Sequence, residues 1–232
     1  MSEIQKIEAR YSKRVDDWLL SSVVPLHRNL AHQEKERICL RFLRRFPLDQ
    51  LPHLRVLEIG SGFGQNLQQF VRWGFSPSNL VGSELLAERT EIARQLLPEA
   101  ITLFSGDSTQ LNLAPGSFDV VQLSTVLSSI LDDDFQQLLA DTAWSFVRPG
   151  GAILWYDFVV NNPRNPDVRG VPPKRIRLLF PDARIELQSA TLAPPVARFV
   201  TCWAPRLYPV LNCIPLLRTH VLGWLQKPES RA

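Results

Sequence analysis

Short apolar runs alternate with amphipathic stretches along the middle of the chain. Five runs read as buried strands, at residues 55–59, 79–84, 101–107, 118–125 and 152–160. Helical periodicity links them at 65–73, at 85–97 and from the N-cap Asp132 to 146, while Gly74 and Pro98 end two of the helices. The turn Pro149-Gly150-Gly151 leads into the fifth strand. This order predicts an α/β fold, a mainly parallel sheet with helices on both faces.

The flanking regions follow other patterns. Residues 1–50 read as helices, and Ile38, Phe42, Leu43 and Phe46 form one apolar stripe in the second of them. After residue 160 come an irregular loop, a short helix around 174–180, a strand at 184–192, helical pieces over 194–217 and a last strand at 220–226. We predict one domain, residues 1–232, with a helical lead-in at 1–50, a core at 54–160 and a C-terminal region from 161.

Composition is that of a folded globular protein, with 45% hydrophobic and 21% charged residues over 232 positions. The cysteines Cys39, Cys202 and Cys213 are widely spaced and odd in number, which suits neither a disulfide framework nor a zinc site. The N-terminus is polar and no apolar run is long enough to cross a bilayer, so we expect a cytoplasmic protein.

The net charge of +3 is unevenly distributed. Residues 161–232 hold 11 Lys and Arg against 4 Asp and Glu, so this third is strongly basic. Five of these cations surround the loop after residue 160: Arg164, Arg169, Lys174, Arg175 and Arg177. They either attract an anionic substrate or membrane surface, or form a solvated face. The apolar stretch 207–217 either rests on a membrane or packs beneath the final strand.

The most informative segment is the end of the first strand, where residues 56–64 read VLEIGSGFG. Alternate glycines let the backbone turn sharply against a ligand. A dinucleotide site spaces its glycines G-x-G-x-x-G, whereas here the spacing is G-x-G-x-G. Glu58 before the turn would repel a pyrophosphate and suits the ammonium group of a methionine moiety.

Two further acids end the next two strands. Glu84 lies where an acidic side chain accepts both hydroxyls of a ribose, and Asp107 where one accepts from an adenine amino group. Taken alone, each acidic residue could instead be a helix N-cap or lie at a solvated strand end. Three acids at three successive strand ends favour a ligand.

In this order the motifs resemble the class I S-adenosylmethionine-dependent methyltransferase family over residues 56–160. The turn Arg148-Pro149-Gly150-Gly151 is similar to the family's turn before strand five. The resemblance implies a Rossmann-like sheet of seven strands with the last antiparallel, and S-adenosylmethionine as cofactor. The cofactor-binding residues it implies are Glu58, Gly60, Ser61, Gly62, Gly64, Glu84, Leu85, Asp107, Ser108 and Gln122. Tyr11 and Arg14 resemble an N-terminal Tyr-x-x-Arg that reaches the cofactor carboxylate in some members.

Several acceptor classes lack their motifs. Gln122-Leu123-Ser124-Thr125 replaces the Asn/Asp-Pro-Pro-aromatic motif of amino-methylating enzymes, and Ser124 stands where metal-dependent members need an acid. No Pro-Cys nucleophile is present. We therefore expect direct transfer to an oxygen or nitrogen without a metal, with Asp157 as base and Tyr156 beside it at the crevice. Asp157 is equally well read as a loop cap, and His220 and His32 are alternative bases.

The expected acceptor is a small molecule or a glycan. The loop after strand five offers amide and guanidinium groups for sugar hydroxyls or anions, and its Asn-Pro-Arg-Asn-Pro segment at 162–166 resembles a branch associated with bacterial polysaccharide and secondary biosynthesis. No nucleic-acid partner is expected, and peripheral membrane contact stays open. The competing hypotheses are a catalytically inactive binding subunit of the same fold and a nicotinamide-dependent oxidoreductase.

Overall fold

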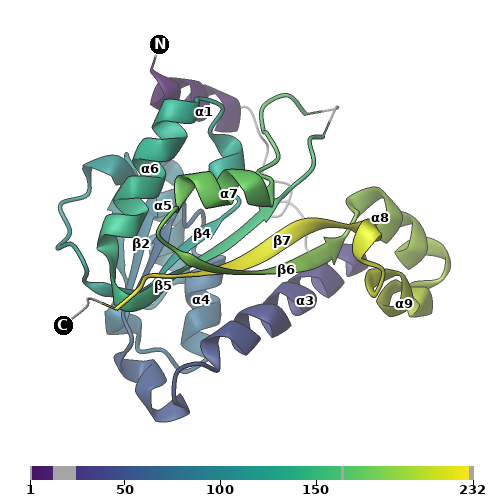
Figure 1. The fold of residues 1–232 in the computed structure, drawn as a ribbon, viewed down its shortest axis with the longest axis horizontal. Coiled ribbons are helices and arrows are strands. Elements are labelled where there is room, and N and C mark those ends of the chain that lie inside the picture. The colour runs from purple at the N-terminus through teal and green to yellow at the C-terminus, as the bar shows by residue number, and fades with distance from the viewer. Residues whose placement is uncertain (1, 13–24, 163–164, 230–232) are drawn as a thin grey trace.

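The computed structural model describes residues 2–12, 25–162 and 165–229. Its centre is a seven-stranded sheet in the order β3-β2-β1-β4-β5-β7-β6 (Figure 1). The strands are β1 (Val56–Ile59), β2 (Leu80–Glu84), β3 (Thr102–Ser105), β4 (Phe118–Ser124), β5 (Val147–Phe158), β6 (Arg184–Leu192) and β7 (Arg218–Gln226). Only β7 runs antiparallel to its neighbours, β5 and β6, and the remaining pairs are parallel. The predicted Rossmann-like fold class is confirmed.

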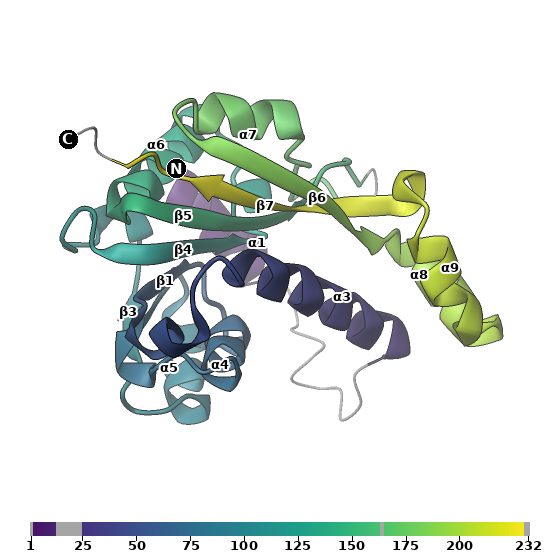
Figure 2. The ribbon, with the colours of Figure 1, turned by 60° about the horizontal axis from the view of Figure 1, so that its bottom comes forward.

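Helices cover both faces of the sheet because successive strand residues point to opposite sides. Val56 belongs to the core under α3, α4 and α5, whereas Leu57 belongs to the core under α1, α6 and α7 (Figure 2). The α-helices are α1 (Glu3–Tyr11), α3 (Leu26–Leu43), α4 (Gln65–Arg72), α5 (Ala87–Leu96), α6 (Asp133–Phe146), α7 (Pro173–Leu179), α8 (Pro194–Trp203) and α9 (Tyr208–Asn212). Short 3₁₀ helices are η1 (Leu48–His53), η2 (Pro77–Asn79), η3 (Ser108–Gln110), η4 (Leu127–Ser129), η5 (Pro205–Leu207) and η6 (Pro215–Leu217).

Strand β5 begins earlier than the sequence predicts. The expected turn at Pro149-Gly150-Gly151 lies inside the strand, which already pairs Val147 with Phe118 and resumes regular pairing with β4 only at Ala152. Gly150, at φ +76°, takes up the irregularity, and its N–H donates to the Lys227 carbonyl at 3.1 Å. Glycine reaches this backbone region without the steric cost that other residues carry, so the chain bulges here and stays in the sheet.

Beyond the sheet, the ends of β6 and β7 carry a projection built from residues 193–217, which we call the arm (Figures 1 and 2). The Ala193 N–H donates to the Leu217 carbonyl at 2.8 Å and closes its base. Inside the arm, Ala197, Val200 and Tyr208 form a small core with Leu192, and Leu30 of α3 packs against it. The helical pieces predicted over this segment are confirmed as α8, η5, α9 and η6.

Candidate cofactor and acceptor site

A cavity of about 800 Å³ opens at the carboxyl ends of the central strands. Strand order reverses between β1 and β4, whose following segments lead to opposite sides, and such a switch point leaves a crevice above a parallel sheet. Helices α1 and α3 wall the cavity from outside the sheet. Eight of the sequence-predicted site residues line it: Gly60, Ser61, Gly62, Glu84, Leu85, Asp107, Ser108 and Tyr156.

The three glycines of the first turn serve different purposes. All have positive φ, +71° at Gly60, +54° at Gly62 and +84° at Gly64. A Cβ at Gly60 would meet Val126 at 2.6 Å, and one at Gly64 would meet Leu97 at 2.4 Å. A Cβ at Gly62 would meet nothing within 4 Å, because that position faces the open cavity. Gly62 is therefore the glycine that leaves room for a ligand, while Gly64 begins α4 away from the cavity wall.

The acids at the ends of β2 and β3 are both fixed by hydrogen bonds. Glu84 accepts from the N–H of Gly62 at 2.8 Å and from the N–H of Leu86 at 3.0 Å. Asp107 accepts from the Thr109 N–H at 2.9 Å, so it caps η3 and also lines the cavity. Both carboxylates thus stand at the wall in set orientations, which a ribose and an adenine amino group require of their acceptors.

Glu58 lies behind the wall. It is fully buried at the end of β1, where Asn66 donates to its Oε1 at 2.5 Å, and its Oε2 has no partner among the described residues. Burial raises the pKa of Glu58 to about 8, although Asn66 and Lys35 lower it. Gln122, which pairs with Glu58 in register on β4, does not line the cavity either. The structure gives Gln122 no contact with this space.

Lys35 of α3 is a residue that the sequence patterns missed. Its Nζ donates to Ser124 Oγ at 2.9 Å and to Asn66 Oδ1 at 3.0 Å, and lies 4.8 Å from the centre of the Tyr156 ring. Burial lowers the pKa of Lys35, while the charges of Cys39 and Glu58 raise it. Helix α3 carries charges on several sides, so periodicity alone gave no reason to single out one lysine.

Tyr156 and Asp157 end β5 on different sides of the sheet. The Tyr156 hydroxyl pairs with Thr191 Oγ1 at 2.8 Å, and burial raises the pKa of the phenol well above 10, so Tyr156 keeps its proton. Asp157 is fully buried, does not line the cavity, and accepts the N–H groups of Ser128 and Phe158, each at 3.0 Å. Burial raises the pKa of Asp157 to about 7. The prediction that Asp157 faces the crevice is wrong, because consecutive strand residues point to opposite faces.

His32 and His220, the alternative bases, also differ in whether they line the cavity. His32 lines the cavity from α3, and burial lowers its pKa. His220 stacks on Tyr156, with ring centres 5.2 Å apart, and stands outside the cavity wall. Burial, with a smaller contribution from the charge of Lys35, lowers the pKa of His220 to about 4. His220 therefore supports the ring of Tyr156 in its neutral form.

Two threonines around Tyr156 hold unusual backbone conformations. Thr125, at φ +58°, lines the cavity and donates its N–H to the Tyr156 carbonyl at 2.7 Å. Thr191, at φ +62°, binds the Tyr156 hydroxyl. A positive φ is strained for a β-branched residue, and such strain gathers at functional sites. The end of β5 is thus held firmly at the acceptor side of the cavity.

Comparison with known proteins identifies the arrangement. Residues 56–151 match the family described as "Methyltransferase domain". They form a class I methyltransferase domain. S-adenosylmethionine is its cofactor and methyl transfer its activity. No curated protein matches the sequence.

Solved structures share the fold of this methyltransferase. An S-adenosylmethionine-dependent methyltransferase from Mesorhizobium loti is 20% identical at a TM-score of 0.58, covering 83% of this chain and 97% of its own. The PH0226 protein of Pyrococcus horikoshii reaches a TM-score of 0.62 at 10% identity, and the match covers 90% of this chain and 94% of that protein. The [4+2]-cyclase SpnF is 14% identical at 0.57, with 76% and 75% covered, so neighbours with this fold differ in described activity.

The residues of the methyltransferase fit its cofactor. The open space at Gly62 admits a ligand against the backbone, and the carboxylate of Glu84 stands beside it. Glu58 lies behind the wall, and its unpartnered carboxylate oxygen would favour the positive charge of a methionine ammonium through electrostatic attraction, without direct contact. When bound, S-adenosylmethionine supplies an electrophilic methyl group on sulfur. Among the described residues, no three His, Cys, Asp or Glu side chains gather closely enough to hold a metal ion.

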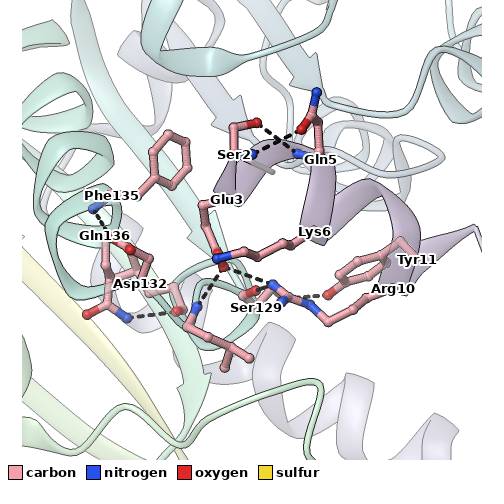
Figure 3. A network of polar contacts seen from close by, with 12 residues as sticks. Ser2, Glu3, Gln5, Lys6, Arg10, Tyr11, Ser129, Asp132, Phe135 and Gln136 are labelled. Atoms are coloured by element: carbon pink, nitrogen blue, oxygen red, sulfur yellow. Dashed lines mark hydrogen bonds and ion pairs between the residues drawn. The ribbon is translucent and has the colours of Figure 1, made fainter.

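Helix α1 closes one side of the methyltransferase cavity through Ile4, Ile7 and Tyr11. Glu3 anchors the helix, accepting from Arg10 at 3.0 Å and from the Leu131 N–H at 3.1 Å (Figure 3). The Tyr11 hydroxyl hydrogen-bonds Ser129 Oγ. Tyr11 thus lies at the cavity as the N-terminal motif predicts, whereas Arg14 lies outside the described residues.

The predicted cluster of cations after residue 160 does not face the cavity. Arg169 forms an ion pair with Asp133 at the start of α6, and Arg175 lies 3.5 Å from the same carboxylate. Neither they nor Lys174 and Arg177 line the cavity, and Arg164 lies outside the described residues. Among the described residues, attraction of an anionic acceptor into the cavity therefore falls to a cation outside this cluster.

Proposed function

We propose that this methyltransferase transfers the methyl group to an oxygen or nitrogen of a small anionic molecule or glycan end, by direct transfer without a metal. Cavities of about 300 to 1,000 Å³ are typical of small-molecule sites, and the volume of about 800 Å³ suits the cofactor with a small acceptor beside it. A polymer would enter only by its end.

The observation that carries this proposal is the place of Lys35. Gly62, Glu84 and Asp107 line the cavity from the β1, β2 and β3 side, which we assign to the cofactor. Lys35 meets Ser124 and the ring of Tyr156 at the ends of β4 and β5, on the other side of the strand-order reversal. An ammonium at that place attracts a negatively charged acceptor toward the reactive methyl group.

The chain's residues contribute orientation more than proton transfer. Tyr156 keeps its proton, and Asp157 does not reach the cavity, so neither takes a proton from the acceptor. Lys35 holds the acceptor, the strained Thr125 fixes the floor, and α1 covers the site against water. Methyl transfer is an in-line displacement, and correct positioning alone accounts for a large part of its acceleration.

Calorimetric titrations with S-adenosylmethionine and with NAD test the cofactor, and a screen with cofactor labelled on the methyl group tests the acceptor. We expect micromolar-range binding of S-adenosylmethionine only, and label transfer to carboxylated or phosphorylated acceptors in preference to their neutral analogues. Binding of NAD alone would support the oxidoreductase alternative. Cofactor binding without transfer to any acceptor would support the inactive binding subunit, and preference for neutral amines would overturn the anionic acceptor.

A further inference from the structure

The arm presents its apolar side chains outward. Phe199 is 68% exposed, Trp203 79% and Leu216 95%. Further exposed apolar side chains on the arm are Leu207, Val210 and Ile214. Ala197 and Val200 already fill the small core of the arm, so the outer face is not used in packing. Large apolar side chains exposed together on one small projection indicate an interaction site.

Positive charge accompanies this surface. No Asp or Glu occurs between Glu186 and Glu229, a stretch that contains the whole arm. Arg198 and Arg206 are exposed on it. Burial, followed by the charges of Arg28 and Arg198, lowers the pKa of His27, so the positive region continues onto the start of α3.

We propose that the arm docks this protein on the surface of an anionic membrane. Exposed Trp, Phe and Leu side chains insert into the boundary between headgroups and acyl chains, while arginines beside them pair with anionic headgroups. Helices α8 and α9, of 10 and 5 residues, lie on such a surface without spanning it. Within the described ranges, no helix is long and apolar enough to cross a bilayer.

A second copy of the chain fits the surface less well. Two arms packed face to face would bring Arg198 and Arg206 of both copies into one interface. The arm offers no carboxylate to pair with them, and like charges in a desolvated interface are unfavourable. An anionic lipid surface supplies negative headgroups to pair with the arginines and acyl chains to surround the apolar side chains.

The arm also connects to the catalytic cavity through α3. Leu30 packs against the core of the arm, while Asn29, His32 and Gln33 of the same helix line the cavity. Docking of the arm therefore brings one wall of the cavity close to the bilayer. If the proposed anionic acceptor is carried on a lipid, this arrangement delivers it to Lys35; that part rests on the proposed function.

Vesicle co-sedimentation of the full chain without cofactor tests the docking by itself. We expect binding to vesicles of phosphatidylcholine mixed with phosphatidylglycerol, weaker binding to phosphatidylcholine alone, and weakening as salt rises. The double variant Phe199→Ser with Trp203→Ser should bind roughly tenfold to a hundredfold more weakly, since two large apolar side chains no longer insert. The double variant Leu48→Ser with Leu178→Ser, at exposed sites on other elements, should bind like the wild type.

A fluorescent thiol probe gives a second measurement that depends on the place of contact. Cys202 and Cys213 are exposed on the arm and Cys39 is buried, so Cys213→Ser leaves one accessible thiol. An environment-sensitive dye on Cys202 should shift to the blue more strongly with anionic vesicles than with vesicles of phosphatidylcholine alone. Absence of binding to anionic vesicles, or equal binding by the Phe199 and Trp203 variant, would overturn the proposal. So would a wild type that is dimeric in solution and a variant that is monomeric. None of these results bears on methyl transfer, which is measured separately with soluble acceptors.

Discussion

Lys35 and Ser124, 89 positions apart in the sequence, meet at the floor of the cavity, with Nζ donating to Oγ at 2.9 Å. This contact joins the N-terminal helix α3 to the end of β4. The motif that defines amino-methylating relatives is absent from the end of β4, and the ammonium of Lys35 stands there instead. If Lys35 holds the acceptor as proposed, acceptor choice depends on a residue outside the family's own motifs.

Replacing Lys35 should affect the acceptor more than the cofactor. We expect Lys35→Met to raise the KM for an anionic acceptor roughly tenfold to a hundredfold, the loss of one charge-assisted hydrogen bond, with the S-adenosylmethionine Kd nearly unchanged. Lys35→Arg should restore part of the affinity. Lys174→Met, in the cation cluster away from the cavity, is the control and should behave like the wild type.

The same residue predicts a pH dependence. Burial lowers the pKa of Lys35, so its ammonium is lost at a lower pH than that of a free lysine. The KM for an anionic acceptor should therefore rise as the pH climbs through the lowered pKa, and the Lys35→Met variant should lack this rise. The groups that share the electrostatic environment of Lys35 are Cys39, Glu58, His32 and His220. A KM equally pH-dependent in both proteins would assign the effect to one of these neighbours.

Gly62 should be the glycine that matters for binding. Gly62→Ala and Gly74→Ala both place a Cβ at a positive φ with no atom within 4 Å, so both should lose about 1 kcal/mol of unfolding free energy. Of these two glycines, Gly62 lines the cavity and Gly74 does not. Chemical denaturation should show similar losses, while calorimetry shows weaker S-adenosylmethionine binding in Gly62→Ala alone. Equal binding by the two variants would refute the assignment of this turn to the cofactor.

Glu58 should release a proton when the cofactor binds. Burial raises the pKa of its carboxyl to about 8, so at pH 7 the carboxyl is mostly protonated, and a methionine ammonium would favour its ionised form. Titration at pH 7 in two buffers of different ionisation enthalpy should show release of about one proton. Glu58→Gln should abolish the release and Glu36→Gln at the cavity wall should keep it. Heats independent of the buffer would separate Glu58 from cofactor binding.

Without cofactor, the protonation of Glu58 should change the free energy of unfolding with pH. A carboxyl whose folded pKa lies above its ordinary value of 4.5 stabilises the fold in its protonated form. That contribution is complete below the ordinary pKa and is lost as the pH rises through about 8. Denaturation of the wild type and of Glu58→Gln across this range should converge in the acid and separate toward pH 8.

The sequence specifies the sheet and the cofactor half of the site because both depend on local signals. The glycines after β1 and the acids ending β2 and β3 follow one another at short spacing, and seven of the ten predicted cofactor-binding residues line the cavity. The acceptor half depends on contacts between distant segments, such as Lys35 with Ser124 and Tyr156 with Thr191. Asp157 shows the limit of strand-end reasoning, since one residue's shift along β5 turns a side chain to the other face.

Docking of helix α1 should depend on Glu3. Its carboxylate is buried and accepts from Arg10 and from the N–H of Leu131, so Glu3→Ala leaves that N–H without its partner. A lost buried hydrogen bond to a charged group costs about 1 to 3 kcal/mol, and here the loss falls on the opening of α1. Hydrogen exchange over residues 3–11 should become roughly tenfold to a hundredfold faster.

Protonation of Glu3 in acid should weaken the docking of α1, as Glu3→Ala does. Burial raises the pKa of Glu3, but the hydrogen bonds from Arg10 and Leu131 and the charges of Arg10 and Lys6 outweigh it and leave the pKa below its ordinary value of 4.5. The stabilisation is therefore complete above 4.5 and is lost as the pH falls through the lowered pKa. The protection of α1, measured relative to the intrinsic exchange rate at each pH, should fall in acid in the wild type and also in Glu8→Ala on the same helix, but not in Glu3→Ala. Since Ile4 and Ile7 line the cavity, Glu3→Ala should also weaken S-adenosylmethionine binding. If hydrogen exchange and cofactor affinity were both unchanged in that variant, α1 would be held by its apolar contacts alone.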